Sequence, residues 1–284
     1  MNNLVLMFFL VFMLCACGTD SEDTVNSDAV ATGDIYATFQ VVSDGDGYVY
    51  AEAQLTRGIT PSESFSEFAF VRLVDKDELW LSAGEDIESL SLSDNLFERF
   101  KDLEDTQGVF RAASSPRESY EFLFTRVTIN NFGTWYSARL PLSDDREYRV
   151  ALFRDEDVGA SARNSVVVIP DTFEITSPLQ SERFSRTDDD IVLQWDAVDV
   201  QSSVEVEAVT TCSDESVETF LVTETTDAGS YTISAGELAE DTLNGACSTT
   251  LNVRKVRLGQ FDSRFVGGAV HGYEVRRIVI VTED

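Results

Sequence analysis

The chain has 284 residues and a formal net charge of −30, from 51 acidic and 21 basic side chains. A surface of this sign repels phosphate backbones and anionic lipid headgroups, which argues against nucleic acid as a partner and against electrostatic binding to a membrane. With 43% of its residues apolar, the chain can bury more than one small core, and two domains are the natural expectation.

An unbroken apolar run from Leu4 to Leu14 opens the chain. A helix needs about 20 such residues to span the hydrocarbon core of a bilayer, so this run is too short for a transmembrane anchor. Its length and position are typical of the hydrophobic region of a signal peptide.

The residues that follow, Leu14-Cys15-Ala16-Cys17-Gly18, resemble the lipobox of bacterial lipoproteins, where Leu at minus three and a small residue at minus one precede the lipidated cysteine. The resemblance implies a signal peptide over residues 1–16 and an acylated Cys17, carrying palmitate-type chains, as the mature N-terminus. Several acyl chains would make membrane attachment essentially permanent. Gly18 replaces the Asp that marks inner-membrane retention, which implies the outer membrane of a Gram-negative envelope, on its periplasmic or its surface face. The alternative is an ordinary secretory signal that leaves Cys17 a plain thiol.

Residues 17–33 are acidic and without periodicity, which predicts a flexible tether. Beyond it, short alternating runs bounded by turn residues predict a β-sandwich over residues 34–170. The clearest element is a hairpin whose turn is Ser43-Asp44-Gly45-Asp46-Gly47. The predicted strands are 35–41, 49–55, 68–74, 79–82, 108–112, 120–128, 134–140, 148–153 and 165–169, of which the third and fourth are expected to form a second hairpin. A short helix is predicted from Ser93 or Asp94, because Leu96, Phe97, Phe100 and Leu103 share one face.

A domain boundary is expected near residue 171, where Pro170 and Pro178 bound a short strand. An opening strand that ends in Pro, a polar stretch and an alternating strand that ends in Trp195 resemble the start of immunoglobulin-like and fibronectin type III-like modules. The resemblance covers residues 172–284 and implies a second β-sandwich domain over 171–284. The expected architecture is therefore all-β, with two β-sandwich domains like those of many uncharacterised Gram-negative lipoproteins. The remaining predicted strands are 204–211, 219–225, 230–234, 249–258 and 273–281.

Past the lipobox, Cys212 and Cys247 are the two remaining cysteines. An exported protein lies in an oxidising compartment, so the pair predicts a disulfide bond. Because Trp195 precedes both cysteines, this disulfide is not the one of antibody domains. A zinc site is the alternative, and two Cys with a single His fall short of four ligands.

Residues for catalysis or cofactor binding are sparse. His271 is the single histidine, within a glycine-rich segment expected to be a turn, and the chain contains no Gly-x-Ser-x-Gly and no Gly-Lys step. Asp44-Gly45-Asp46-Gly47 lacks later ligands of a calcium loop and is better explained as a hairpin turn. With 51 acidic residues, a carboxylate pair has almost no specificity as a sign of glycoside hydrolysis. We expect no catalytic residues, no metal and no cofactor.

Basic residues gather near the C-terminus, where the apolar face of two predicted strands changes parity. The change suggests paired β-bulges at these charged positions. One interpretation is a docking patch for an acidic protein or a polysaccharide, and the other is internal neutralisation of acidic groups or docking onto the first domain. The residues concerned are Arg254, Lys255, Arg257, Arg276 and Arg277.

The sequence thus predicts a lipid-anchored cell-envelope protein with a structural or recognition role and no enzymatic activity. Its expected partners are the membrane, through the N-terminal lipid, and an envelope protein or polysaccharide. The alternatives are a carbohydrate-processing hydrolase or its accessory factor, and a lipoprotein subunit of an envelope assembly.

Overall fold

The computed structural model describes residues 24–58, 69–74, 77–83, 120–123, 125–129, 133–155, 159–196, 198–213, 216–224, 226–239, 243 and 245–283. In these ranges the regular structure is β-strand apart from two short 3-10 turns, which confirms the all-β fold class. None of these segments forms a helix long and apolar enough to cross a membrane. Cys17 and the helix predicted from Ser93 or Asp94 lie outside the described residues.

The strands follow one another closely along the chain. The N-terminal elements are β1 (Thr24–Asn26), η3 (Ser27–Ala29), η4 (Thr32–Asp34), β2 (Ile35–Ser43), β3 (Tyr48–Arg57), β4 (Ala69–Arg72), β5 (Glu78–Ala83), β6 (Tyr120–Leu123), β7 (Thr125–Ile129), β8 (Gly133–Pro141), β9 (Glu147–Phe153) and β10 (Ala162–Val168). The C-terminal elements are β11 (Ile175–Ser177), β12 (Arg183–Ser185), β13 (Ile191–Trp195), β14 (Ser203–Cys212), β15 (Val217–Glu224), β16 (Ser230–Ile233), β17 (Cys247–Leu258) and β18 (Gly267–Glu283).

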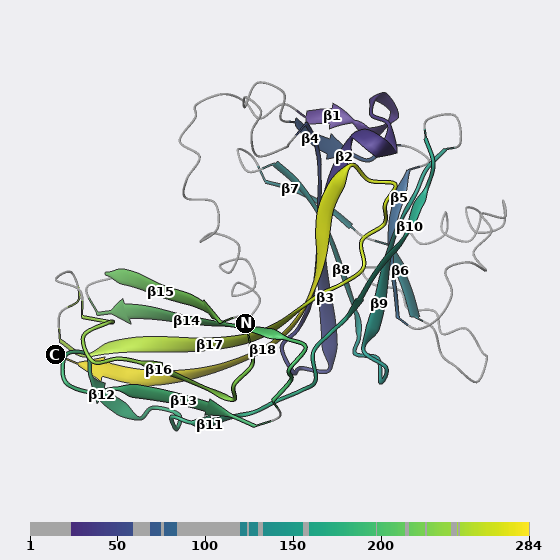
Figure 1. The fold of residues 1–284 in the computed structure, drawn as a ribbon. Helices are drawn as coiled ribbons and strands as arrows, with labels where there is room; N and C mark the ends of the chain where they lie inside the picture. The colour runs from purple at the N-terminus through teal and green to yellow at the C-terminus, as the bar shows by residue number, and fades with distance from the viewer. Residues whose placement is uncertain are drawn as a thin grey trace.

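Three sheets build two β-sandwiches (Figure 1). An eleven-stranded sheet, called the shared sheet, has the order β1-β4-β3-β2-β18-β17-β14-β15, with β8 also beside β3, β7 beside β8 and β12 beside β18. The four-stranded sheet β10-β9-β5-β6 covers one end of the shared sheet and the three-stranded sheet β11-β13-β16 covers the other. The molecule is therefore two sandwiches that have one sheet in common.

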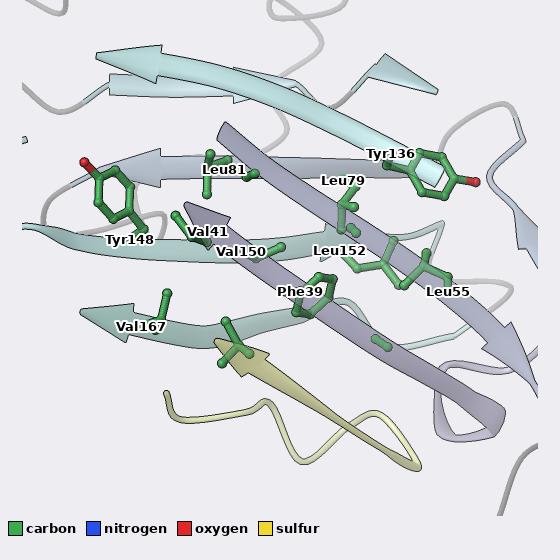
Figure 2. Packing of buried hydrophobic residues seen from close by; sticks show 14 of the residues in the cluster. Phe39, Val41, Leu55, Leu79, Leu81, Tyr136, Tyr148, Val150, Leu152 and Val167 are labelled. Atoms are coloured by element: carbon green, nitrogen blue, oxygen red, sulfur yellow. The ribbon is translucent and has the colours of Figure 1, made fainter. Parts of the chain in front are cut away.

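The first core lies between the shared sheet and the four-stranded sheet (Figure 2). Alternate residues of β2 and β3 point inward, so Phe39 and Leu55 are buried against Leu81 and Leu152 from the opposite sheet. The hairpin predicted over 35–55 is confirmed: β2 and β3 pair in one register from Ile35–Arg57 to Ser43–Val49.

The second core is smaller and lies between the three-stranded sheet and the far end of the shared sheet. Leu193 of β13 and Phe173 pack there against Val206 of β14 and Leu251 of β17. The Trp195 side chain, at the end of β13, belongs to the same cluster.

The longest strand, β18, belongs to both sandwiches. Its first half, from Gly267 to Glu274, pairs parallel with β2, while residues 271–282 pair antiparallel with β17. Val270 is part of the first core, and Ile280, on the same face of the strand, is part of the second. The division expected at residue 171 therefore misses that the C-terminal region contributes a strand to the first sandwich.

The paired β-bulges predicted in β17 and β18 are absent from the described strands. Every pair from Cys247–Thr282 to Leu258–His271 keeps one register. The inward face of β17 continues from Val253 to Lys255. The apparent parity change came from the assumption that charged side chains point outward.

The second predicted hairpin is also wrong. β4 pairs with β1 and β3 in the shared sheet, whereas β5 pairs with β6 and β9 in the four-stranded sheet. Between β4 and β5 the chain crosses from the shared sheet to the four-stranded sheet, so the two strands bury their side chains from different layers.

Residues 24–33, predicted to be part of the flexible tether, are packed against the first sandwich, so that part of the prediction is wrong. Val30 is buried and β1 pairs parallel with β4. The buried guanidinium of Arg154 donates hydrogen bonds to the carbonyls of Ser27 and Val30, the latter at 2.7 Å, and forms an ion pair with Asp77 at 3.1 Å. Buried donors need such acceptors, so this segment completes the fold.

We expect Arg154→Met to lower the free energy of unfolding by about 3–5 kcal/mol, because it leaves the buried Asp77 carboxylate unpaired. Residues 24–33 should also become accessible to limited proteolysis. Chemical denaturation measures the first effect and mass spectrometry of early fragments the second. The control is Arg183→Met, which removes the exposed Arg183–Glu283 pair and should cost less than about 1 kcal/mol. Equal losses in the two variants would contradict this role for Arg154.

Candidate functional site

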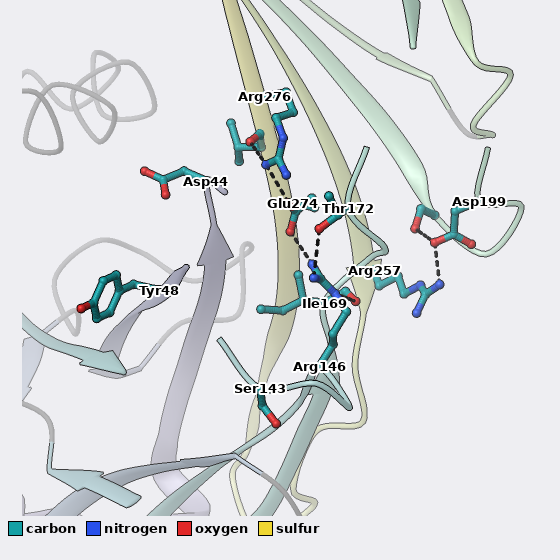
Figure 3. A network of polar contacts seen from close by, with 12 residues as sticks. Asp44, Tyr48, Ser143, Arg146, Ile169, Thr172, Asp199, Arg257, Glu274 and Arg276 are labelled. Carbon is teal, nitrogen blue, oxygen red and sulfur yellow. Dashed lines mark hydrogen bonds and ion pairs between the residues drawn. The ribbon is translucent and has the colours of Figure 1, made fainter. Parts of the chain in front are cut away.

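Four of the five basic residues singled out in the sequence form ion pairs with acidic side chains: Arg254, Lys255, Arg257 and Arg276. Arg254 of β17 donates to Glu207 of β14 at 2.6 Å. Arg257 donates to Asp199 at 2.6 Å (Figure 3). These pairings are those expected from internal neutralisation.

A second group of ion pairs lies where the two sandwiches meet (Figure 3). Glu274 of β18 has no exposed side-chain area and pairs with Arg276 at 2.6 Å and with Arg146. Arg146 also donates to Thr172 at 3.2 Å and to the carbonyl of Ile169 at 3.4 Å. The network formed by Arg146, Glu274 and Arg276, called the junction network, joins the segment after β10 to the middle of the shared strand.

Gly45 is required beside this network. Its φ is +83°, and a Cβ there would lie 2.9 Å from Cζ of Arg276. The turn between β2 and β3 therefore packs closely against the junction network. A glycine at this position agrees with the predicted hairpin turn, because only glycine adopts a positive φ without strain.

Lys255 differs from the other members of the basic group because it is fully buried. Its Nζ lies 2.8 Å from Oδ2 of Asp227, and neither side chain has exposed area. Burial favours the neutral acid, but hydrogen bonds from Lys255, the Asp199 amide, Trp195 and the Gly229 amide outweigh it and hold the pKa of Asp227 below its ordinary value. Lys255 is thereby removed from the predicted docking patch. Arg277 is an exposed member of that patch.

The predicted disulfide between Cys212 and Cys247 is confirmed. The two residues are direct partners on β14 and β17, with their Cα atoms 4.2 Å apart. A disulfide that closes a loop of 35 residues stabilises the folded state by about 4 kcal/mol in the chain-entropy model, because it restricts the unfolded chain. The buried Arg186 donates to Cys247 Sγ at 3.2 Å and to the carbonyl of Thr282 at 3.0 Å, which fixes the end of β18 beside the bond.

The outer face of the shared sheet carries a row of polar side chains that the sequence did not reveal. Direct strand partners place Ser137 of β8, Glu52 of β3, Gln40 of β2 and His271 of β18 side by side in that order. Neighbouring side chains in such a row lie about 5 Å apart, which is close enough to bind one ligand. We call these four residues with Gln54 the outer row. His271 thus lies within a strand and not in the turn that was expected.

Two buried polar atoms of the outer row have no hydrogen-bond partner: Nε2 of Gln54 and Nδ1 of His271. Buried polar groups are usually paired, and each unpaired one costs about 1–3 kcal/mol. Both atoms belong to side chains of the outer face, where the neighbouring carboxyl, amide and hydroxyl groups of the row offer further donors and acceptors.

Burial shifts the titratable groups of this face toward their uncharged forms. It raises the pKa of Glu52 to about 6 and lowers the pKa of His271. Burial, with the nearby Glu205 charge, raises the pKa of Tyr273 to about 12. This part of a strongly acidic chain is therefore suited to an uncharged, hydrogen-bonding ligand.

Tyrosine rings flank the outer row on the same face. The Arg139 guanidinium lies 3.8 Å from the ring centroid of Tyr48 and 5.0 Å from that of Tyr50. The ring of Tyr36 lies over Gly267, where a Cβ would come within 2.7 Å of it. Flat rings beside amide and carboxyl groups form a surface that can stack on a sugar ring and bind its hydroxyl groups.

A hollow of about 280 Å³ lies at the edge of the second sandwich, beside β13 and β16. The described residues that line it carry no acidic, basic or histidine side chain, which gives a hydrolase no acid–base pair at this place. They are Trp195, Val204, Thr226, Ala228, Ser230, Tyr231 and Thr232. Within the described ranges, no group of three or more His, Cys, Asp or Glu residues is arranged to hold a metal ion.

We expect Glu52→Gln to stabilise the protein at high pH and to have no effect at low pH. The raised pKa, from 4.5 to about 6, means that the folded state favours the protonated acid, so stability is lost as pH rises through this window. Replacement by the uncharged amide should raise the free energy of unfolding by about 1–2 kcal/mol at pH 8 and leave it unchanged at pH 4. Urea denaturation at both pH values measures this. Glu147→Gln, at a more exposed carboxylate, is the control and should change little at either pH; a gain of the same size at pH 4 would refute the assignment.

Comparison with known proteins identifies no family. No family model and no curated protein matches the chain. Among solved structures, the chicken CNTN1 FN1-FN3 domains are 10% identical, with 87% of this chain and 65% of that chain covered and a TM-score of 0.22. The Fcho1 Mu homology domain from Danio rerio, with bound Eps15 peptide, is 9% identical, with 93% and 98% covered and a TM-score of 0.16. Such scores are too low to assign a fold or a function, so the fold rests on the strands and cores described above.

Proposed function

We propose that this protein is a non-enzymatic, lipid-anchored component of a bacterial cell envelope that recognises an uncharged polysaccharide through the outer face of its shared sheet. The anchoring part rests on the lipobox around Cys17. Because the net charge of −30 disfavours contact with anionic headgroups, the acyl chains would supply the attachment.

The observation that carries the recognition part is the outer row. Glu52, Gln40 and His271 come from three adjacent strands, and Gln54 Nε2 and His271 Nδ1 lack partners. Sugar hydroxyl groups donate and accept hydrogen bonds, so they would bind the carboxyl, amide and imidazole groups of this row. Tyr36 and Tyr273 on the same face add apolar ring surface for the sugar rings.

The packing of the shared sheet holds the side chains of the outer row in place before any ligand binds. The outer row lies on strands whose other faces are packed in the first core, and Tyr273 lies on the strand that continues into the second core. Little freedom would be lost on binding, which favours affinity for a repetitive, weakly interacting polymer.

The anchor is tested by fractionating cells that express the wild-type chain or Cys17→Ala. We expect the wild type to pellet with membranes and to incorporate labelled palmitate, and the variant to remain unlabelled in the soluble fraction, because the acylated thiol is removed. A variant that still pelleted as an acylated species would refute lipidation at Cys17.

The recognition face is tested by native electrophoresis in gels that contain dextran, β-glucan or galactan. The strongly negative chain migrates freely, and an uncharged polymer retards it only through binding. We expect one of these polymers to retard the wild type, and Gln54→Ala or His271→Ala to reduce the retardation at least several-fold. Gln194→Ala, which removes the same amide from the exposed side of β13, is the matched control and should behave as wild type. Wild-type mobility unchanged by all three polymers, or equal retardation of all variants, would contradict the proposed face.

A further inference from the structure

We propose that Lys255 and Asp227 condense to form an intramolecular amide bond, so that the second sandwich carries a covalent cross-link in addition to its disulfide. This inference is independent of the proposed recognition function. It begins from the position of the pair: Nζ of Lys255 lies 2.8 Å from Oδ2 of Asp227, and both side chains are completely withdrawn from solvent.

The surroundings hold the two reacting groups together and keep water away. Lys255 is on β17, and Asp227 is in the connection between β15 and β16. The ring of Phe173 lies 4.6 Å from Nζ of Lys255, and the indole of Trp195 donates to Asp227 from the other side. A nucleophile and an acyl carbon fixed this closely in a buried site react as if at very high local concentration.

The two oxygens of Asp227 have different partners, and the difference assigns them different roles. Oδ1 accepts hydrogen bonds from Trp195 Nε1 at 2.8 Å and from the Gly229 amide at 3.0 Å. Oδ2 accepts from the Asp199 amide at 2.8 Å and lies against Lys255 Nζ. Two fixed donors at Oδ1 are placed to stabilise an oxyanion there, while Oδ2 is placed to receive protons from Nζ and to leave.

The reaction balances without a cofactor. The pair starts as ammonium and carboxylate, and one proton moves from Nζ to Oδ2. The freed lone pair of Nζ attacks Cγ of Asp227, and negative charge develops on Oδ1, where Trp195 and Gly229 donate. A second Nζ proton then passes to Oδ2, the Cγ–Oδ2 bond breaks, and one water molecule leaves. One Nζ–Cγ bond has formed, no electron has been transferred, and the net charge of the pair is zero throughout.

Burial supplies the driving force. An ammonium and a carboxylate withdrawn from water each carry a large desolvation penalty, which only their mutual contact and hydrogen bonds offset. The amide is neutral, keeps both donors on Oδ1 and removes both charges. Glu274, the direct strand partner of Lys255, pairs with Arg146 and Arg276.

The bond would fasten β17 at both of its ends. The disulfide already joins Cys247, the first residue of β17, to β14. An amide at Lys255 would join its other end to the segment that leads into the three-stranded sheet. The connection that leads into β16 would then be held covalently to a strand of the shared sheet.

Mass spectrometry of the wild-type chain tests this without any variant. After the disulfide is reduced and the chain is denatured, chymotrypsin cleaves after Tyr231 and Leu251 and so separates residue 227 from residue 255. We expect one branched product that joins the two peptides, lower than their summed mass by one water, with fragment ions that place the link at Asp227 and Lys255. Two separate, unmodified peptides would overturn the proposal.

Two variants check the chemistry. Lys255→Arg should show no branched product, because guanidinium is not a nucleophile here, and Asp227→Asn should give the same product with loss of ammonia in place of water. Arg257→Lys, which puts an amine beside Asp199 in a half-buried ion pair, is the matched control and should form no second link. A branched product that persists in Lys255→Arg would also overturn the assignment.

Discussion

Strand β18 is the constraint on which the rest of the structure depends. Its hydrogen bonds to β2 on one side and to β17 on the other make one sheet out of two sandwiches. The close parallel approach to β2 is possible because Gly268, at φ +132°, has no side chain; a Cβ there would lie 1.8 Å from the carbonyl oxygen of Ala37. Both cores, the junction network and the outer row all use side chains of this one strand.

The buried charges follow from the same arrangement. Where a strand passes from one core to the next, it crosses a region that neither set of apolar residues fills, and Glu274 with its two arginines occupies that place. Replacing such a network by apolar residues is often neutral for stability, but removing one partner is costly. Loss of any one member of the network would therefore destabilise the fold more than the intact network stabilises it.

Sequence patterns predicted those parts of the fold that are local. The hairpin of β2 and β3 alternates cleanly around a glycine-rich turn, and the cysteine pair had few other interpretations. The pairing of β4 and β5 was not predictable, because a strand pattern does not state which sheet the strand joins. The outer row joins the β2–β3 hairpin to β8 and β18, which lie far from it in the chain, so no local spacing reveals the whole row.

The inward positions of Lys255 and Glu274 follow from the alternation of their strands, but the pattern was interpreted as a change of parity. The alternation of Leu251 and Val253 continues to Lys255, as that of Ile278 continues back to Glu274, and these charged residues do point inward. Charged residues are almost never fully buried unless paired. A charge at an inward position is therefore a reason to search for its partner, and Asp227 lies 28 residues earlier in the sequence.

The packing of residues 24–33 around Arg154 limits how far the folded part can lie from a membrane. If Cys17 is the acylated residue, only seven Cα–Cα steps separate it from Thr24, a reach of at most ~25 Å for extended chain. A connection of that length would hold the first sandwich close to the bilayer. The end of the molecule that carries β1 and β4 would stay close to the lipid surface, and the strand shared by both sandwiches would then set the direction in which the second one projects (Figure 1).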